Sequence, residues 1–125
     1  MIDHVSITVS DLARATVFYE KLLAALGHTK LREGETTSGF GKSYPEFWIN
    51  LRDGEHAPSG THVALRAPDI AAVHAFHTTA LANGGVCDGP PGYREIYNPR
   101  YYAAFIRDAD GNRIEAVTFV EKDTD

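Results

Sequence analysis

The 125-residue chain has little cysteine and no long apolar runs. A single cysteine, Cys87, excludes an intrachain disulfide and argues against the disulfide-rich secreted proteins. No apolar run approaches the roughly 18–20 residues that a membrane-spanning helix needs. The first residues lack a basic stretch followed by an apolar stretch, so we expect no signal peptide and a cytoplasmic location.

Basic residues are also in deficit. Lys and Arg number 12 against 17 Asp and Glu, which gives a net charge of −5. This balance disfavours nucleic acid or an anionic membrane as a partner. The length and the 43% hydrophobic content fit one compact domain with its own core. We therefore expect a small domain that acts on small molecules or proteins.

An internal repeat divides the chain into two similar parts. Residues 4–27 match residues 62–85 without a gap, at a constant offset of 58 residues. The identical pairs are His4/His62, Val5/Val63, Asp11/Asp69, Ala13/Ala71, Phe18/Phe76, Leu23/Leu81, Ala24/Ala82 and Gly27/Gly85. Two copies are too few for a solenoid, so the repeat predicts a duplicated half-domain whose halves pair about a pseudo-twofold axis.

Each copy of the repeat has the pattern of a strand followed by a helix. Apolar and polar residues alternate around Val5 and Val63, as in a half-buried strand. Asp11 and Asp69 follow in N-cap positions, and apolar residues then recur at helical spacing. Gly27 fits the position just beyond the first helix.

Shorter strands are predicted after each helix. The first half has strands at 29–33, 37–41 and 46–51, and the second has a short strand from Val86, an irregular loop at 88–100, and a hairpin of 101–107 and 112–120. The order βαβββ is thus repeated. We divide the single domain, residues 1–125, into half-module 1 (1–53), a linker (54–60), half-module 2 (61–120) and a polar tail (121–125).

Three polar side chains share the strand faces that point away from the predicted helices. His4 and His62 begin the matched strands, and Glu115 alternates with Ile114 and Ala116 in the last strand. If the sheet is curved, all three point into its concave side. Two imidazoles and a carboxylate suit a divalent transition metal and leave positions open for substrate oxygens. A lone histidine at a strand start is more often structural, but the matched positions favour a metal site.

With these residues the chain resembles the vicinal oxygen chelate superfamily, which includes glyoxalases, extradiol dioxygenases and bleomycin-resistance proteins. The resemblance rests on HVSITVSDLARATVFYEKLL, THVAL and FIRDADGNRIEAV, the last with Ala109 where proline is usual. It implies an α+β fold, in which two βαβββ modules form a cupped, incompletely closed eight-stranded mixed sheet with helices outside. It also implies that His4, His62 and Glu115 are metal ligands, for zinc, nickel, iron, manganese or cobalt.

One position departs from the pattern of glyoxalase I. That enzyme and methylmalonyl-CoA epimerase have a Glu or Gln ligand on the last strand of the first half, where strand phase places Asn50. The amide oxygen makes Asn50 a weak fourth candidate, but Asn is shorter than Gln and is not a useful proton acceptor. The remaining His, His, Glu set resembles that of extradiol dioxygenases and fosfomycin-resistance thiol transferases.

Further side chains are candidates for a substrate pocket. Glu46 and Trp48 share the face of Asn50, and Arg66 shares the phase of His62. A loop rich in tyrosine offers phenol donors and two arginines for anion contacts, namely Tyr93, Tyr97, Tyr101, Tyr102, Arg94 and Arg100. Core packing is the alternative role of Trp48, and a surface loop or dimer contact is the alternative for the tyrosines.

Three functions remain open. The first is a metal-dependent enzyme of lyase, isomerase or dioxygenase type, whose metal chelates neighbouring oxygens of a small substrate. The alternative is a metal-free protein that sequesters a small molecule, as bleomycin-resistance proteins do. A third is a scaffold with a relic triad. The resemblance implies a homodimer, with the cup built within one chain or by exchanged halves. With exchange, His4 of one chain faces His62 and Glu115 of the other.

Overall fold

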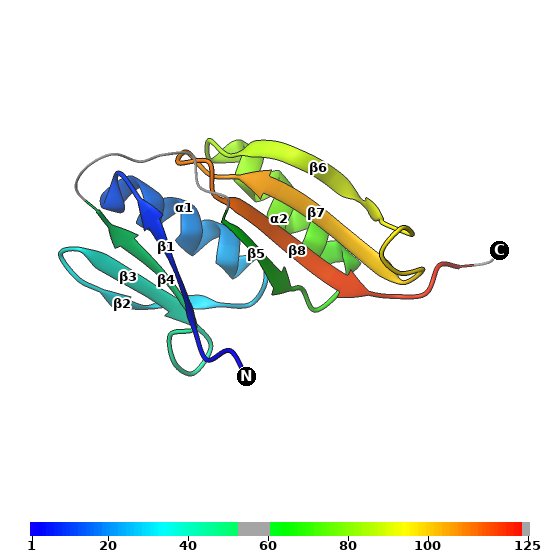
Figure 1. The fold of residues 1–125 in the computed structure, drawn as a ribbon, viewed down its shortest axis with the longest axis horizontal. Coiled ribbons are helices and arrows are strands. Elements are labelled where there is room, and N and C mark those ends of the chain that lie inside the picture. Colours follow the sequence, from blue (N-terminus) through cyan, green and yellow to red (C-terminus); the bar gives the residue numbers. More distant parts are fainter. Residues whose placement is uncertain (53–60, 124–125) are drawn as a thin grey trace.

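Two βαβββ units follow one another along the chain (Figure 1). The computed structural model describes residues 1–52 and 61–123. The first unit consists of β1 (Val5–Val9), α1 (Leu12–Ala24), β2 (Thr29–Glu33), β3 (Thr37–Gly41) and β4 (Phe47–Leu51). The second consists of β5 (His62–Arg66), α2 (Ile70–Ala82), β6 (Val86–Tyr93), β7 (Tyr101–Arg107) and β8 (Arg113–Phe119). The repeated element order is as predicted, whereas the expected linker at 54–60 lies outside the described residues.

The strands form two four-stranded mixed sheets with the same topology. The strand orders are β1-β4-β3-β2 and β5-β8-β7-β6. In each sheet the first pair is parallel and the other two pairs are antiparallel. The predicted α+β class with open sheets is therefore confirmed. β1 and β5 are edge strands, and no ladder joins them in the described part of the chain.

Each helix covers one face of its own sheet (Figure 1). Fully buried side chains from both units form one continuous core, which includes Tyr19, Leu22, Ile49, Phe76, Ile106 and Ile114. Burial of this apolar surface is the main stabilising contribution to the fold. The alternate strand residues point to the opposite side, which we call the open face of each sheet. Among the described residues no helix is long and apolar enough to span a membrane.

Both helices start where the sequence predicts. The Asp11 carboxylate accepts a hydrogen bond from the backbone N of Arg14 at 3.1 Å. In the second unit Asp69 accepts one from the backbone N of Ala72 at 2.8 Å. Each bond satisfies a backbone donor that would otherwise lack an intrahelical partner. Gly27, with φ of 89°, turns the chain after α1, because glycine tolerates this left-handed conformation.

The second half differs from the prediction at β6. Residues 88–93 were expected in an irregular loop, but they belong to a strand that pairs with β7. The register shifts between Cys87 and Gly89 and again between Gly89 and Gly92. An edge strand with such irregularities can accommodate proline and glycine, since one of its sides makes no ladder bonds. The glycine and proline content of residues 88–93 therefore led to the wrong prediction of a loop.

The turn between β7 and β8 is organised by one buried carboxylate. Asp108 Oδ1 accepts from the backbone N of Asp110 and of Asn112, both at 2.9 Å. Its Oδ2 accepts from the Asn112 side chain at 2.9 Å and from the Tyr19 hydroxyl at 2.5 Å. Tyr19 lies on α1, so Asp108 links the second unit to the helix of the first.

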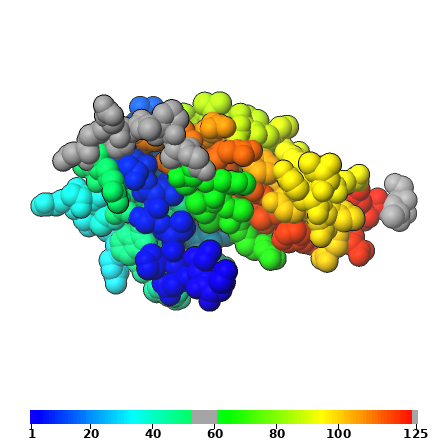
Figure 2. Space-filling model, viewed as in Figure 1, coloured from blue at the N-terminus to red at the C-terminus, as the bar shows by residue number. Residues whose placement is uncertain are grey.

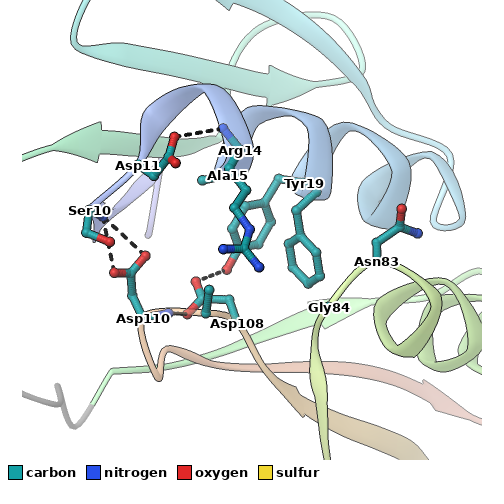
Figure 3. Close-up of a pocket in the computed structure, with 11 residues that line it drawn as sticks. Ser10, Asp11, Arg14, Ala15, Tyr19, Asn83, Gly84, Asp108 and Asp110 are labelled. Atoms are coloured by element: carbon teal, nitrogen blue, oxygen red, sulfur yellow. Dashed lines mark hydrogen bonds between the residues drawn. The ribbon is translucent and has the colours of Figure 1, made fainter.

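The same turn also contacts the end of β1, beside α1 (Figure 3). Both carboxylate oxygens of Asp110 lie 3.2 Å from the backbone N of Ser10. The Asn112 side chain donates to the Thr8 carbonyl at 3.0 Å. The Asp-Ala-Asp-Gly-Asn sequence therefore joins the two units to one another.

Candidate functional site

Glu115 lies on the open face of the second sheet. Successive side chains of a strand point to opposite faces, and the two neighbours of Glu115 point into the core. Ile114 and Ala116 are fully buried against the helices. Glu115 lies on the other side, opposite Phe105 on β7 and Ala64 on β5. Its carboxylate is 1% exposed, although it lies on a face that no helix covers. A buried carboxylate needs polar partners, and two side chains supply them.

His62 and Tyr101 are these partners. His62 Nε2 lies 2.8 Å from Glu115 Oε1, and the Tyr101 hydroxyl donates to Oε2. The His62 side chain is 42% exposed, so the pair is accessible from the open face. Burial and the contact with Glu115 raise the pKa of the Tyr101 phenol well above its usual value. Tyr101 therefore remains a neutral donor around pH 7, which fixes the orientation of the carboxylate.

An apolar and aromatic floor surrounds the His62–Glu115 pair. Ala103, Phe105 and Val117 form a second buried cluster on the open face, with Tyr101 and Phe119 packed against it. The rings of Tyr101 and Phe119 meet edge to face at 5.4 Å between centroids. Such a floor excludes water from one side of the pair and offers a packing surface to an organic ligand.

The pocket residues predicted in the second half lie on both sides of its sheet. The Arg66 guanidinium lies 4.9 Å from the centroid of Phe119, on the same open face as Glu115. Tyr97 contacts Tyr101, with 5.1 Å between ring centroids. Tyr93 instead contacts Tyr102, on the helix side of the sheet. The phenol of Tyr102 is 2.6 Å from His74 Nε2 on α2, which identifies that side.

His4 lies in the other half, immediately before β1. Its Nδ1 is 2.8 Å from Asp3 Oδ1, and Tyr44 donates from its hydroxyl to Asp3 Oδ2 at 2.9 Å. Hydrogen bonds from His4 and Tyr44 lower the pKa of Asp3. A carboxylate that binds one imidazole nitrogen leaves the other available as a metal ligand. Asp3 was not among the residues predicted for the site. Its position directly before His4 in the sequence was the signal that could have identified it.

The remaining predicted residues of the first half share its open face. The Asn50 amide donates to Ser6 Oγ on the neighbouring strand. The Trp48 ring lies over Gly39, where a Cβ would come within 2.7 Å of the indole. Glu46 is exposed and directly precedes β4. Glycine at position 39 is what allows the tryptophan to lie flat on the sheet.

Within one chain the three predicted metal ligands do not form one cluster. His4, Glu46 and His62 line a cleft of about 430 Å³ between β1 and β5. Figure 2 shows the N-terminal residues and β5 next to one another on the same side of the molecule. Nevertheless, across residues 1–52 and 61–123 no three His, Cys, Asp or Glu side chains are grouped to hold a metal ion. The structure pairs His62 with Glu115 and leaves His4 apart from them.

Comparisons with known proteins identify the family. The model of the glyoxalase/bleomycin resistance protein/dioxygenase superfamily matches residues 1–116. A glyoxalase/bleomycin resistance protein from Albidiferax ferrireducens T118 is 32% identical, with a TM-score of 0.83 over 92% of this chain and 96% of that one. No curated protein sequence matches significantly.

More distant crystal structures share the fold. A family enzyme from Burkholderia phytofirmans PsJN has a TM-score of 0.76 at 14% identity, over 95% of this chain and 98% of that one. The fosfomycin resistance protein FosX from Mesorhizobium loti has a TM-score of 0.69 at 19% identity, over 96% and 92%. Together with the matched sequence, these likenesses lead to one conclusion. The chain belongs to the glyoxalase/bleomycin resistance protein/dioxygenase superfamily.

Proposed function

We propose that this protein is a metal-dependent enzyme of the glyoxalase-like group, active as a homodimer on a small molecule. A divalent transition metal would be held by His62 and Glu115 of one chain and by His4 of a second copy. The contact between His62 Nε2 and Glu115 Oε1, 2.8 Å apart, is the observation that carries the proposal. When bound, such an ion supplies Lewis-acid stabilisation to two neighbouring substrate oxygens.

The residues present fit a metal of this kind. An imidazole nitrogen and a carboxylate oxygen are donors that Zn²⁺, Fe²⁺, Ni²⁺, Mn²⁺ and Co²⁺ accept. Tyr101 holds the second oxygen of Glu115, and Asp3 holds Nδ1 of His4. Partners of this type orient the ligands of metal sites and tune their basicity. Asn50, bonded to Ser6, remains a weak fourth candidate.

A second copy is the natural source of the third ligand. Within one chain His4 lies apart from the His62–Glu115 pair, and β1 and β5 are both edge strands. Unpaired strand edges are surfaces on which another chain can add. Contact between β1 of one copy and β5 of another would bring His4, which precedes β1, towards His62, which begins β5. Twofold symmetry would then form two equivalent sites.

The chain's own residues would bind and orient the substrate. The aromatic floor around Phe105 and Phe119 packs against its apolar part, and Trp48 forms a wall on the first sheet. The hydroxyl of Tyr101 donates to Glu115 and holds its carboxyl group in place. Glu46, exposed at the edge of the cleft, would accept a proton from the substrate. The reaction is of lyase, isomerase or dioxygenase type.

Metal titration tests this proposal. Protein stripped with chelator is titrated with Zn²⁺ by calorimetry, and we expect one ion per chain. His62→Ala or Glu115→Gln should lower the affinity roughly a hundredfold, since four ligands of a structural zinc site together supply about 10–16 kcal/mol. The matched controls are His77→Ala, at a half-buried position on α2, and Glu33→Gln, at an exposed position on β2; both should bind zinc as the wild type does. Zinc binding that none of the variants weakens would refute the proposal.

A metal-free binding protein is the second candidate function. The half-buried rings of Tyr101 and Phe119 on the open face favour it, because an aromatic surface suits ligand binding without any metal. The same titration separates the two functions. Wild-type protein that takes up no metal ion but still binds small organic ligands would support the second candidate.

A further inference from the structure

The open face of the second sheet is basic, although the protein is acidic overall. The net charge is −5, yet this face has four arginines, namely Arg66, Arg94, Arg107 and Arg113. Asp88 pairs with two of them, at 3.3 Å from Arg107 Nε and also with Arg113 Nε. Glu115, a second carboxylate of this face, is bonded to His62 and Tyr101. Arg66 and Arg94 are thus left without a carboxylate partner in the described part of the chain.

Arg94 is fixed in place by its backbone. Its N donates to the Tyr101 carbonyl at 2.8 Å, and its carbonyl accepts from the backbone N of Tyr97 at 3.0 Å and of Asn98 at 3.3 Å. These bonds close the turn that connects β6 to β7 and place Arg94 at its base. A side chain on such a turn needs little further ordering when it binds a ligand.

The guanidinium of Arg94 is held across β6, over Phe105. Its Nη2 donates to the Pro90 carbonyl at 2.6 Å, and its Cζ lies 5.4 Å from the centroid of the Phe105 ring. Gly89 and Gly92 make room for it, since a Cβ at either position would come within 3.2 Å of a guanidinium nitrogen. A stacked guanidinium keeps its remaining N–H groups free at the edge of its plane.

The position of Arg94 places this cation beside the candidate metal site. Phe105 is the direct cross-strand neighbour of Glu115 on β7, and such neighbours have Cβ atoms roughly 5 Å apart. Arg94 is half-buried, whereas Arg66 is exposed and contacts Phe119, four residues beyond Glu115 along β8. A half-buried cation that lacks a protein anion is best neutralised by an anionic ligand, and arginine binds carboxylates through two parallel bonds.

We propose that Arg94 binds the carboxylate of the substrate, so that the enzyme acts on a small organic acid with an apolar body. The acid group contacts Arg94, and the apolar body packs against Tyr101 and Phe119, which are half-buried on the same face. The oxygens that react then lie towards His62 and Glu115. The inference rests on the proposed function for the reaction, but carboxylate binding by Arg94 needs no metal and can be measured separately.

Calorimetry with chelator-treated protein and two probes of the same shape tests the inference. Benzoate carries the carboxylate, and benzamide is its neutral isostere. We expect benzoate to bind about tenfold more tightly, as a charge-assisted pair with arginine should provide. Arg94→Gln should abolish this preference, and Arg94→Lys, which keeps the charge but loses the fork, should retain part of it. Unfolding midpoints of both variants establish that they are folded.

Two matched charge variants complete the experiment. Arg66→Gln removes the other unpaired arginine of the same face, and Arg32→Gln removes an exposed arginine of β2. Both should keep the preference for benzoate. The inference is overturned if wild-type protein binds the two probes equally, if Arg94→Gln keeps the preference, or if Arg66→Gln loses it. Failure of zinc titration alone would contradict the proposed function and leave this result standing.

Discussion

At the residue scale, the site is made of side chains whose partners fix their chemical state. Glu115 is buried, and its two oxygens contact His62 and Tyr101. His4 is exposed, but its Nδ1 is bonded to Asp3. In both places a candidate metal ligand has a polar neighbour that fixes the orientation of its donor atom. Glu115 and His4 are therefore both oriented by hydrogen bonds, although they lie in different halves of the chain.

The substitution Asp3→Asn tests whether Asp3 orients the His4 imidazole for metal binding. The substitution keeps the size of the side chain and removes the negative charge that orients the imidazole through Nδ1. We expect zinc affinity to fall about tenfold, the lower end of the effect of losing a carboxylate partner of a histidine ligand. Calorimetric titration of the variant measures it, with Asp123→Asn as the control for a lost surface charge. Equal affinity in all three proteins would mean that Asp3 does not orient His4.

At the element scale, the buried turn between β7 and β8 joins the halves. Asp108 accepts hydrogen bonds from its own turn and from Tyr19 on α1. The sequence showed this turn as a motif of the family, but the motif did not indicate which contacts it makes. The structure buries Tyr19 completely, and a fully buried tyrosine hydroxyl needs a partner, which Asp108 supplies.

Tyr19→Phe should destabilise the protein, because Asp108 would lose a buried donor. We expect the free energy of unfolding at pH 7 to fall by about 1–3 kcal/mol. Burial and the Asp108 carboxylate raise the pKa of Tyr19 well above its ordinary value of 10.0. The folded state therefore holds this proton more tightly than the unfolded chain does, and the stabilisation is complete below pH 10 and declines above it.

Denaturant unfolding of both proteins between pH 7 and pH 11 measures the effect. The difference between wild type and Tyr19→Phe should be constant up to about pH 10, near the ordinary pKa of tyrosine, and should narrow beyond it. A difference that is absent at pH 7, or one that widens in alkali, would contradict the role given to the Tyr19–Asp108 bond.

Local sequence patterns predicted most elements but not the long-range contacts. The strand alternation and the N-caps Asp11 and Asp69 predicted strands and helices, because these signals act within a few residues, and the repeat predicted that their order recurs. The expected single eight-stranded sheet is instead two four-stranded sheets. The strand predicted from Val86 was too short, because Gly and Pro usually mark loops, whereas here the edge position tolerates them. Strand phase also placed Glu115 and His62 on one face. It could not indicate that Tyr93 turns to the helix side, since the register shifts of β6 depend on tertiary packing.

At the scale of the whole molecule, the two halves share one core but divide the candidate site. Apolar side chains from both units pack together, and the turn at Asp108 fastens them. The His62–Glu115 pair lies in one half, and His4 with Asp3 lies in the other. We propose that a second copy of the chain completes the set of ligands. Under this proposal, metal binding is a property of the dimer.

A heterodimer of two defective chains tests this claim most directly. His4→Ala keeps His62 and Glu115, and Glu115→Ala keeps His4, so a dimer with one chain of each has one intact set of ligands across the interface. The account predicts that the doubly tagged, purified heterodimer regains about half the zinc content of the wild-type dimer, while either variant alone binds almost none. Wild-type protein that binds zinc while the heterodimer recovers none would place the whole site within one chain and contradict the account.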